Sequence, residues 1–113
     1  MNKKVKPDEL NNGDVIWNDN TKFNTKDKST HPTMYLDGVG YSMTSSKDRY
    51  NDRVEYNKDD IKNNQSLGTM YFGKYITKYT NELDKDKEYK VIFTIKRSFI
   101  NKFRNWLKTG KFE

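Results

Sequence analysis

The feature that most constrains the fold is a change of hydrophobic period near the C-terminus. Large apolar residues there recur at the spacing that places side chains on one face of an α-helix, namely Phe99, Ile100, Phe103, Trp106 and Leu107. Ser98 suits the N-cap and Gly110 suits the position after the last turn. The opposite face is polar and basic, with Asn101, Lys102, Arg104, Asn105 and Lys108. We therefore expect a helix at residues 98–109 whose apolar face packs on the rest of the fold.

The chain before this helix favours β-strands. Short runs rich in β-branched and aromatic residues occupy residues 15–17, 33–36, 41–44, 69–72, 75–80 and 89–95. A turn with two glycines at residues 37–40 predicts a hairpin, and Gly73 suggests a bulge. With 113 residues the chain has the size of one domain, so we expect a single domain over residues 1–113. Its predicted class is mainly β, a strongly bent sheet or small barrel packed by a C-terminal helix.

Three polar stretches separate these runs. Residues 1–12 read as a lead-in, and residues 18–30 and 45–65 read as long exposed loops. Within the last stretch we expect at most one short strand or helical turn, anchored by Val54, Tyr56 and Ile61. Gly13 is expected in a turn, and Trp17 is expected in the core.

Composition excludes several function classes. The chain has no cysteine and a single histidine, His31, so disulfide scaffolds, cysteine-based metal sites and histidine clusters are ruled out. No phosphate-binding glycine loop or serine nucleophile elbow occurs, and no cofactor or metal is expected. A secretory signal and a run of about 20 apolar residues are also lacking, which favours a cytoplasmic protein.

Positive charge is concentrated at the C-terminus. Residues 1–88 contain equal numbers of basic and acidic residues, whereas residues 89–113 contain seven Lys and Arg against Glu113 alone. This segment therefore accounts for the whole net charge of +6. Such a patch suits a phosphate backbone, an acidic peptide or an anionic membrane surface, or it is simply a solvated face.

Three segments carry a resemblance. They are Gly13-Asp14-Val15-Ile16-Trp17, His31-Pro32-Thr33-Met34-Tyr35-Leu36 and Met43-Thr44-Ser45-Ser46-Lys47. In this order and spacing the chain resembles the MazF/PemK-like endoribonuclease toxins of bacterial toxin–antitoxin systems. Thr44-Ser45-Ser46-Lys47 also resembles the Thr-Ser-Pro-Lys signature of the branch with RNA antitoxins. One departure is His31, because that family usually has Arg before this proline.

The same residues make chemical sense for cutting RNA without a metal. That reaction requires loss of the 2′-hydroxyl proton, stabilisation of charge on the phosphorane and protonation of the 5′-oxygen. Thr44 and Ser45 could donate to a phosphate oxygen, Lys47 could neutralise charge, and His31 titrates near neutrality. Basic residues expected to bind the RNA are Lys22, Lys26, Lys28, Arg49, Arg53, Lys102 and Arg104. Each of these residues also has an ordinary structural role as a turn, strand-end or solvated side chain.

The leading hypothesis is a metal-independent endoribonuclease toxin that cuts single-stranded RNA. The resemblance implies an SH3-like, PemK-like barrel that forms a homodimer, a product with a 2′,3′-cyclic phosphate, and a cognate antitoxin that is an acidic protein or an RNA. Two alternatives stay open. One is a basic module that binds nucleic acid or an acidic protein without cutting, and the other is an inhibitor of a protein such as gyrase.

Overall fold

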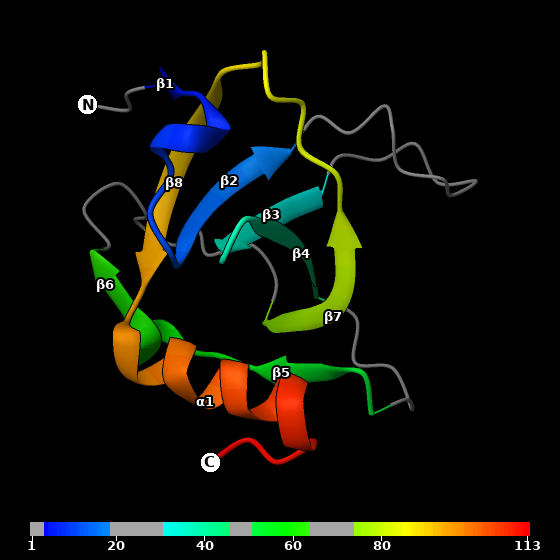
Figure 1. The fold of residues 1–113 in the computed structure, drawn as a ribbon. Coiled ribbons are helices and arrows are strands. Elements are labelled where there is room, and N and C mark those ends of the chain that lie inside the picture. Colours follow the sequence, from blue (N-terminus) through cyan, green and yellow to red (C-terminus); the bar gives the residue numbers. More distant parts are fainter. Residues whose placement is uncertain (1–3, 19–30, 46–50, 64–73) are drawn as a thin grey trace.

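The computed structural model describes residues 4–18, 31–45, 51–63 and 74–113 (Figure 1). The secondary structure elements are β1 Lys4–Val5, η1 Pro7–Glu9, β2 Asp14–Asn18, β3 His31–Leu36, β4 Val39–Thr44, β5 Arg53–Glu55, η2 Lys58–Asp60, β6 Ile61–Asn63, β7 Tyr75–Asn81, β8 Tyr89–Ile95 and α1 Arg97–Thr109. The predicted class, mainly β with a C-terminal helix, is confirmed.

All strand pairs among the described residues are antiparallel. The sheet follows the order β1-β8-β2-β3-β4-β7-β5, and β6 pairs with β8 beside this path. Strands β3 and β4 form the expected hairpin, with a two-residue turn at Asp37 and Gly38 whose φ angles of 51° and 83° are both positive. Positive φ at both central residues is typical of a type I′ turn, whose backbone twist matches the twist of the paired strands.

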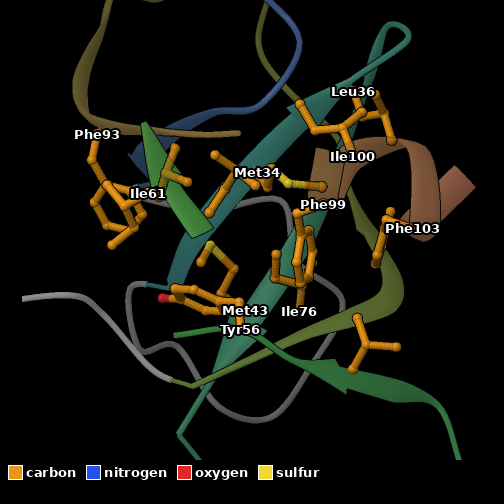
Figure 2. Packing of buried hydrophobic residues seen from close by; sticks show 13 residues of the cluster. Met34, Leu36, Met43, Tyr56, Ile61, Ile76, Phe93, Phe99, Ile100 and Phe103 are labelled. Atoms are coloured by element: carbon orange, nitrogen blue, oxygen red, sulfur yellow. The ribbon is translucent and has the colours of Figure 1, made fainter. Parts of the chain in front are cut away.

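The main core lies between the sheet and α1 (Figure 2). Met34, Met43 and Ile76 come from three adjacent strands and are fully buried. Phe99 and Phe103 reach them from the helix, with ring centroids 6.4 Å apart. Each buried ring removes a large apolar area from water, which compensates for the low hydrophobic content of the chain.

Helix α1 matches its prediction with two corrections. It begins at Arg97 with Lys96 as the N-cap, so the predicted cap at Ser98 was wrong. It ends at Thr109, and the C-cap Gly110 has a φ of 82°, the left-handed conformation expected after a helix. Leu107, which we placed on the buried face, is 38% exposed.

The polar stretches hold more structure than the sequence suggested. Strand β1 and η1 occupy the expected lead-in, and residues 51–63 contain β5, η2 and β6. The three anchors expected there, Val54, Tyr56 and Ile61, are all buried. The predicted strand at residues 69–72 and the bulge at Gly73 lie outside the described residues.

Gly13 fixes the junction between the N-terminal segment and β2. Its φ is +93°, and a Cβ atom at this position would lie 2.6 Å from Ile100 Cδ1 and 2.7 Å from the Ile95 carbonyl oxygen. The Gly13 carbonyl accepts a hydrogen bond of 2.8 Å from the Ile95 N–H. The turn predicted at this glycine therefore also lets β2 approach the end of β8 and the start of α1.

Candidate functional site

Strand register brings His31 and Thr44 to the same end of the sheet. Thr33 pairs with Ser42, so His31, two residues before Thr33, and Thr44, two residues after Ser42, occupy the last positions of the β3–β4 hairpin. His31 also pairs with Asn18 on β2, and Thr44 pairs with Tyr75 on β7. Four neighbouring strands thus place Asn18, His31, Thr44 and Tyr75 in one row across the sheet.

Trp17 lies at this end and is exposed to solvent. Its side chain is 41% exposed, so our placement of Trp17 in the core was wrong. Trp17 pairs with Pro32 near the ends of β2 and β3, beyond the buried Val15 and Ile16. Because side chains alternate along a strand, Trp17 shares a face with Pro32, while Thr44 lies on the other face. An aromatic ring and a hydroxyl are therefore presented from the two sides of one sheet end.

The backbone of Thr44 is linked through Lys74 to the segment that follows β5. The Lys74 N–H donates to the Thr44 carbonyl at 3.2 Å, and the Tyr56 N–H donates to the Lys74 carbonyl at 2.8 Å. Thr44 is half-buried and Ser45, the next residue, is exposed. Two hydroxyl groups therefore follow each other where β4 leaves the sheet. Hydroxyl groups are among the donors that can stabilise a developing oxyanion.

Arg53, predicted to bind RNA, is already engaged with its neighbour. Its Nε donates to Asp52 Oδ1 at 2.9 Å, and Tyr79 donates its hydroxyl proton to Asp52 Oδ2. The hydrogen bond from Arg53, aided by that from Tyr79, holds the pKa of Asp52 below its usual value against the opposing effect of burial. Asp52 and Arg53 are mostly buried, so this pair primarily fixes the start of β5.

Arg104 is also paired, at the opposite end of the hairpin from His31 and Thr44. Its Nε and Nη2 donate to the two carboxylate oxygens of Asp37 at 3.0 and 2.8 Å. This bond lowers the pKa of Asp37 and raises that of Arg104. The Asn12 side chain accepts a hydrogen bond from the Asp37 N–H at 2.9 Å. Lys102 lies exposed on the same helix. The structure therefore separates these helix cations from the row at the other end of the sheet.

Five predicted site residues fall outside the described part of the chain: Lys22, Lys26, Lys28, Lys47 and Arg49. Their placement stays a prediction.

Two residues at the sheet end were missed by the sequence reasoning as site residues, Lys74 and Tyr75. Lys74 is exposed and Tyr75 is half-buried. Their position follows from the pairing of β4 with β7, strands separated by more than thirty residues. The β-prone sequence at residues 75–80 predicted a strand, but it could not predict which strand pairs with it. No local signal could therefore have placed Lys74 and Tyr75 beside Thr44.

The described residues contain no group of three or more His, Cys, Asp or Glu side chains arranged to hold a metal ion. Within the same residues, no helix has both the length and the apolar character needed to cross a bilayer.

Comparison of the chain with protein-family models, with curated proteins and with solved structures gave no match. Membership of the MazF/PemK-like family therefore stays a prediction from the motifs.

Proposed function

We propose that this protein is a metal-independent endoribonuclease that cuts single-stranded RNA at the sheet end formed by His31, Thr44 and Ser45. The observation that supports the proposal is the strand register, which brings the backbone of His31, the single histidine of the chain, to the same end of the β3–β4 hairpin as Thr44, which Ser45 follows in the sequence. The exposed Trp17 ring, at the same end of the sheet but on its other face, supports binding of an unpaired base, because every base offers a face that can stack on an aromatic side chain.

The proposed reaction is an internal transfer. The RNA 2′-oxygen loses its proton and attacks the adjacent phosphorus, the bond from phosphorus to the 5′-oxygen breaks, and that oxygen takes up a proton. The products are a 2′,3′-cyclic phosphate and a free 5′-hydroxyl. In this scheme His31 exchanges the protons. The hydroxyls of Thr44 and Ser45 donate to the non-bridging phosphate oxygens, and Lys47 adds positive charge. The biological role proposed with it is that of a bacterial, cytoplasmic, homodimeric toxin controlled by an antitoxin.

The test compares two threonines. Thr44→Ala should reduce RNA cleavage by ~10²–10³-fold, the usual cost of losing one donor to a developing oxyanion. Thr80→Ala removes the same atoms from an exposed site toward the other end of β7, where Thr80 pairs with Tyr41, and should leave the rate unchanged. Equal rates for both variants would remove Thr44 from the mechanism.

Two substrate controls address the chemistry. Cleavage should continue in excess EDTA, and a deoxyribose at the cut position should stop it, because the attacking 2′-hydroxyl is then absent. Cleavage that persists with the deoxyribose substrate would reject the internal transfer.

A second candidate is a module that binds single-stranded nucleic acid without cutting it. The exposure of Trp17 favours this function as well, since stacking requires no catalytic group. Tight binding of RNA by folded protein, with the RNA intact after long incubation, would establish this candidate and reject the nuclease.

A further inference from the structure

A basic cleft lies at the far end of β2 from the row of His31 and Thr44. It has a volume of about 1050 Å³ and lies where the N-terminal segment, β6, the end of β8 and the start of α1 meet. Figure 1 shows β6 beside the junction of β8 and α1. Three exposed cations line the cleft, Lys62, Lys96 and Arg97, and none of them has an ion-pair partner among the described residues. We infer that this cleft binds the phosphate groups of a single-stranded nucleic acid.

The three cations are brought together by pairing of distant segments. Ile61 pairs with Ile95 and Asn63 pairs with Thr94, so Lys62 is the extra residue of a β-bulge. A bulge redirects the side chain of the extra residue. The Lys96 N–H donates to the Asp60 carbonyl at 2.7 Å, which fastens the start of α1 to the residues just before Lys62. The pairing of β6 with β8 and this backbone hydrogen bond thus hold the three cations in one region.

One carboxylate, that of Asp14, also lines the cleft and offsets one of the three positive charges, so the cleft keeps a net positive charge. Asp14 is buried, and its two carboxylate oxygens accept hydrogen bonds from the Asn11 N–H and the Thr94 hydroxyl, both at 2.8 Å. Arg104 forms part of the wall but is neutralised by Asp37. The first turn of α1 contains no acidic residue, and Lys96 makes no side-chain capping hydrogen bond. The positive end of the helix dipole therefore adds to the field of the three cations.

The hydrogen-bond donors of the cleft favour a chain of phosphates. The cleft is open and mostly polar, and its donors come from lysines, an arginine and the side chains of Asn11, Asn12 and Ser98. Contacts to a nucleic acid backbone come from the same kinds of donor, including helix N-termini. Binding here needs no cleavage, so the inference holds or fails independently of the proposed nuclease activity.

The test measures how affinity for a labelled single-stranded oligodeoxynucleotide depends on salt. This probe lacks the 2′-hydroxyl, so the proposed reaction cannot consume it. The triple variant Lys62→Gln, Lys96→Gln, Arg97→Gln should reduce the log–log salt slope by about 2, because each phosphate contact contributes ~0.7 for a single strand. Each single variant should reduce the salt slope by about 0.7. The single variants therefore still test the inference if the triple variant folds poorly.

The matched control removes equal charge from the other end of β8 and its surroundings. Lys4→Gln, Lys85→Gln, Lys90→Gln changes three exposed lysines outside the cleft, and its slope should stay that of the wild type. An equal decrease of the salt slope in both triple variants would mean that oligonucleotide binding depends only on the net charge of the protein. That result would overturn the inference. The inference would also be overturned if the cleft variants kept the wild-type salt slope but lost the ability to bind inorganic phosphate that the wild type has. The cleft would then be a site for small anions.

Discussion

Replacement of Phe103 by alanine tests whether α1 is an integral part of the core. Phe103 is fully buried, and its ring lies 5.3 Å from that of Tyr41 and 5.4 Å from that of Trp106. Truncating a buried Phe to Ala typically costs ~3–5 kcal/mol, including the cavity left behind. For a domain slightly above 100 residues each kcal/mol lowers the Tm by about 4 °C, so the expected decrease is roughly 12–20 °C.

The control is Leu107→Ala on the same helix. Leu107 is 38% exposed, so its truncation should cost less than half as much, about 1–2 kcal/mol, because only part of its side chain leaves an apolar environment. Urea titrations followed by far-UV circular dichroism give both free energies of unfolding. A cost for Phe103→Ala no greater than that for Leu107→Ala would refute the packing of α1 described here.

Three further predictions concern paired charges and the exposed tryptophan. Asp52→Ala should cost about 3 kcal/mol in urea unfolding, because it leaves the mostly buried Arg53 guanidinium without its carboxylate; a cost near zero would mean that solvent replaces the carboxylate. Because Arg104 lowers the pKa of Asp37, that pair stabilises the fold above the usual Asp pKa and loses this contribution as the pH falls toward the lowered value. Arg104→Gln should thus be up to about 1 kcal/mol less stable at pH 7, with a difference from wild type that shrinks below about pH 4, and a difference constant with pH would contradict the pairing. Trp17→Ala should weaken single-strand binding by ~1–3 kcal/mol while Trp17→Phe retains most of it, and equal affinity of all three proteins in fluorescence anisotropy would exclude stacking.

The sequence predicted the elements that have a clear period. Alternation in β8 and the helical spacing of α1 each identify a buried face, and Phe99 and Phe103 lie on it as expected. The same patterns could not say where the buried region ends. Trp17 and Leu107 continue an apolar face beyond the limit of the core, and they are exposed because no neighbouring element covers them fully.

Contacts between distant segments were beyond the reach of sequence patterns. Arg104 was predicted as a free cation on a polar helix face, yet its partner Asp37 lies 67 residues earlier in the chain, in a hairpin turn. Lys62 was one of many polar residues in a predicted loop, and only the pairing of β6 with β8 puts it beside Lys96. Charge counting identified residues 89–113 as the basic segment. It could not show that Lys62, Lys96 and Arg97 line the same cleft.

Strand β2 runs from the basic cleft to the row of His31 and Thr44. Asp14 at its start borders the basic cleft, and Asn18 at its end lies in the row with His31 and Thr44. Four residue steps along a strand span roughly 13 Å. The Coulomb interaction over that distance is largely screened at physiological ionic strength, so the cleft cations can add affinity for a bound strand without stabilising the charge that develops at the cut phosphate. Loss of the cleft should therefore weaken substrate binding, whereas loss of Thr44 should slow the chemical step, and this separation makes the two proposals independent of each other.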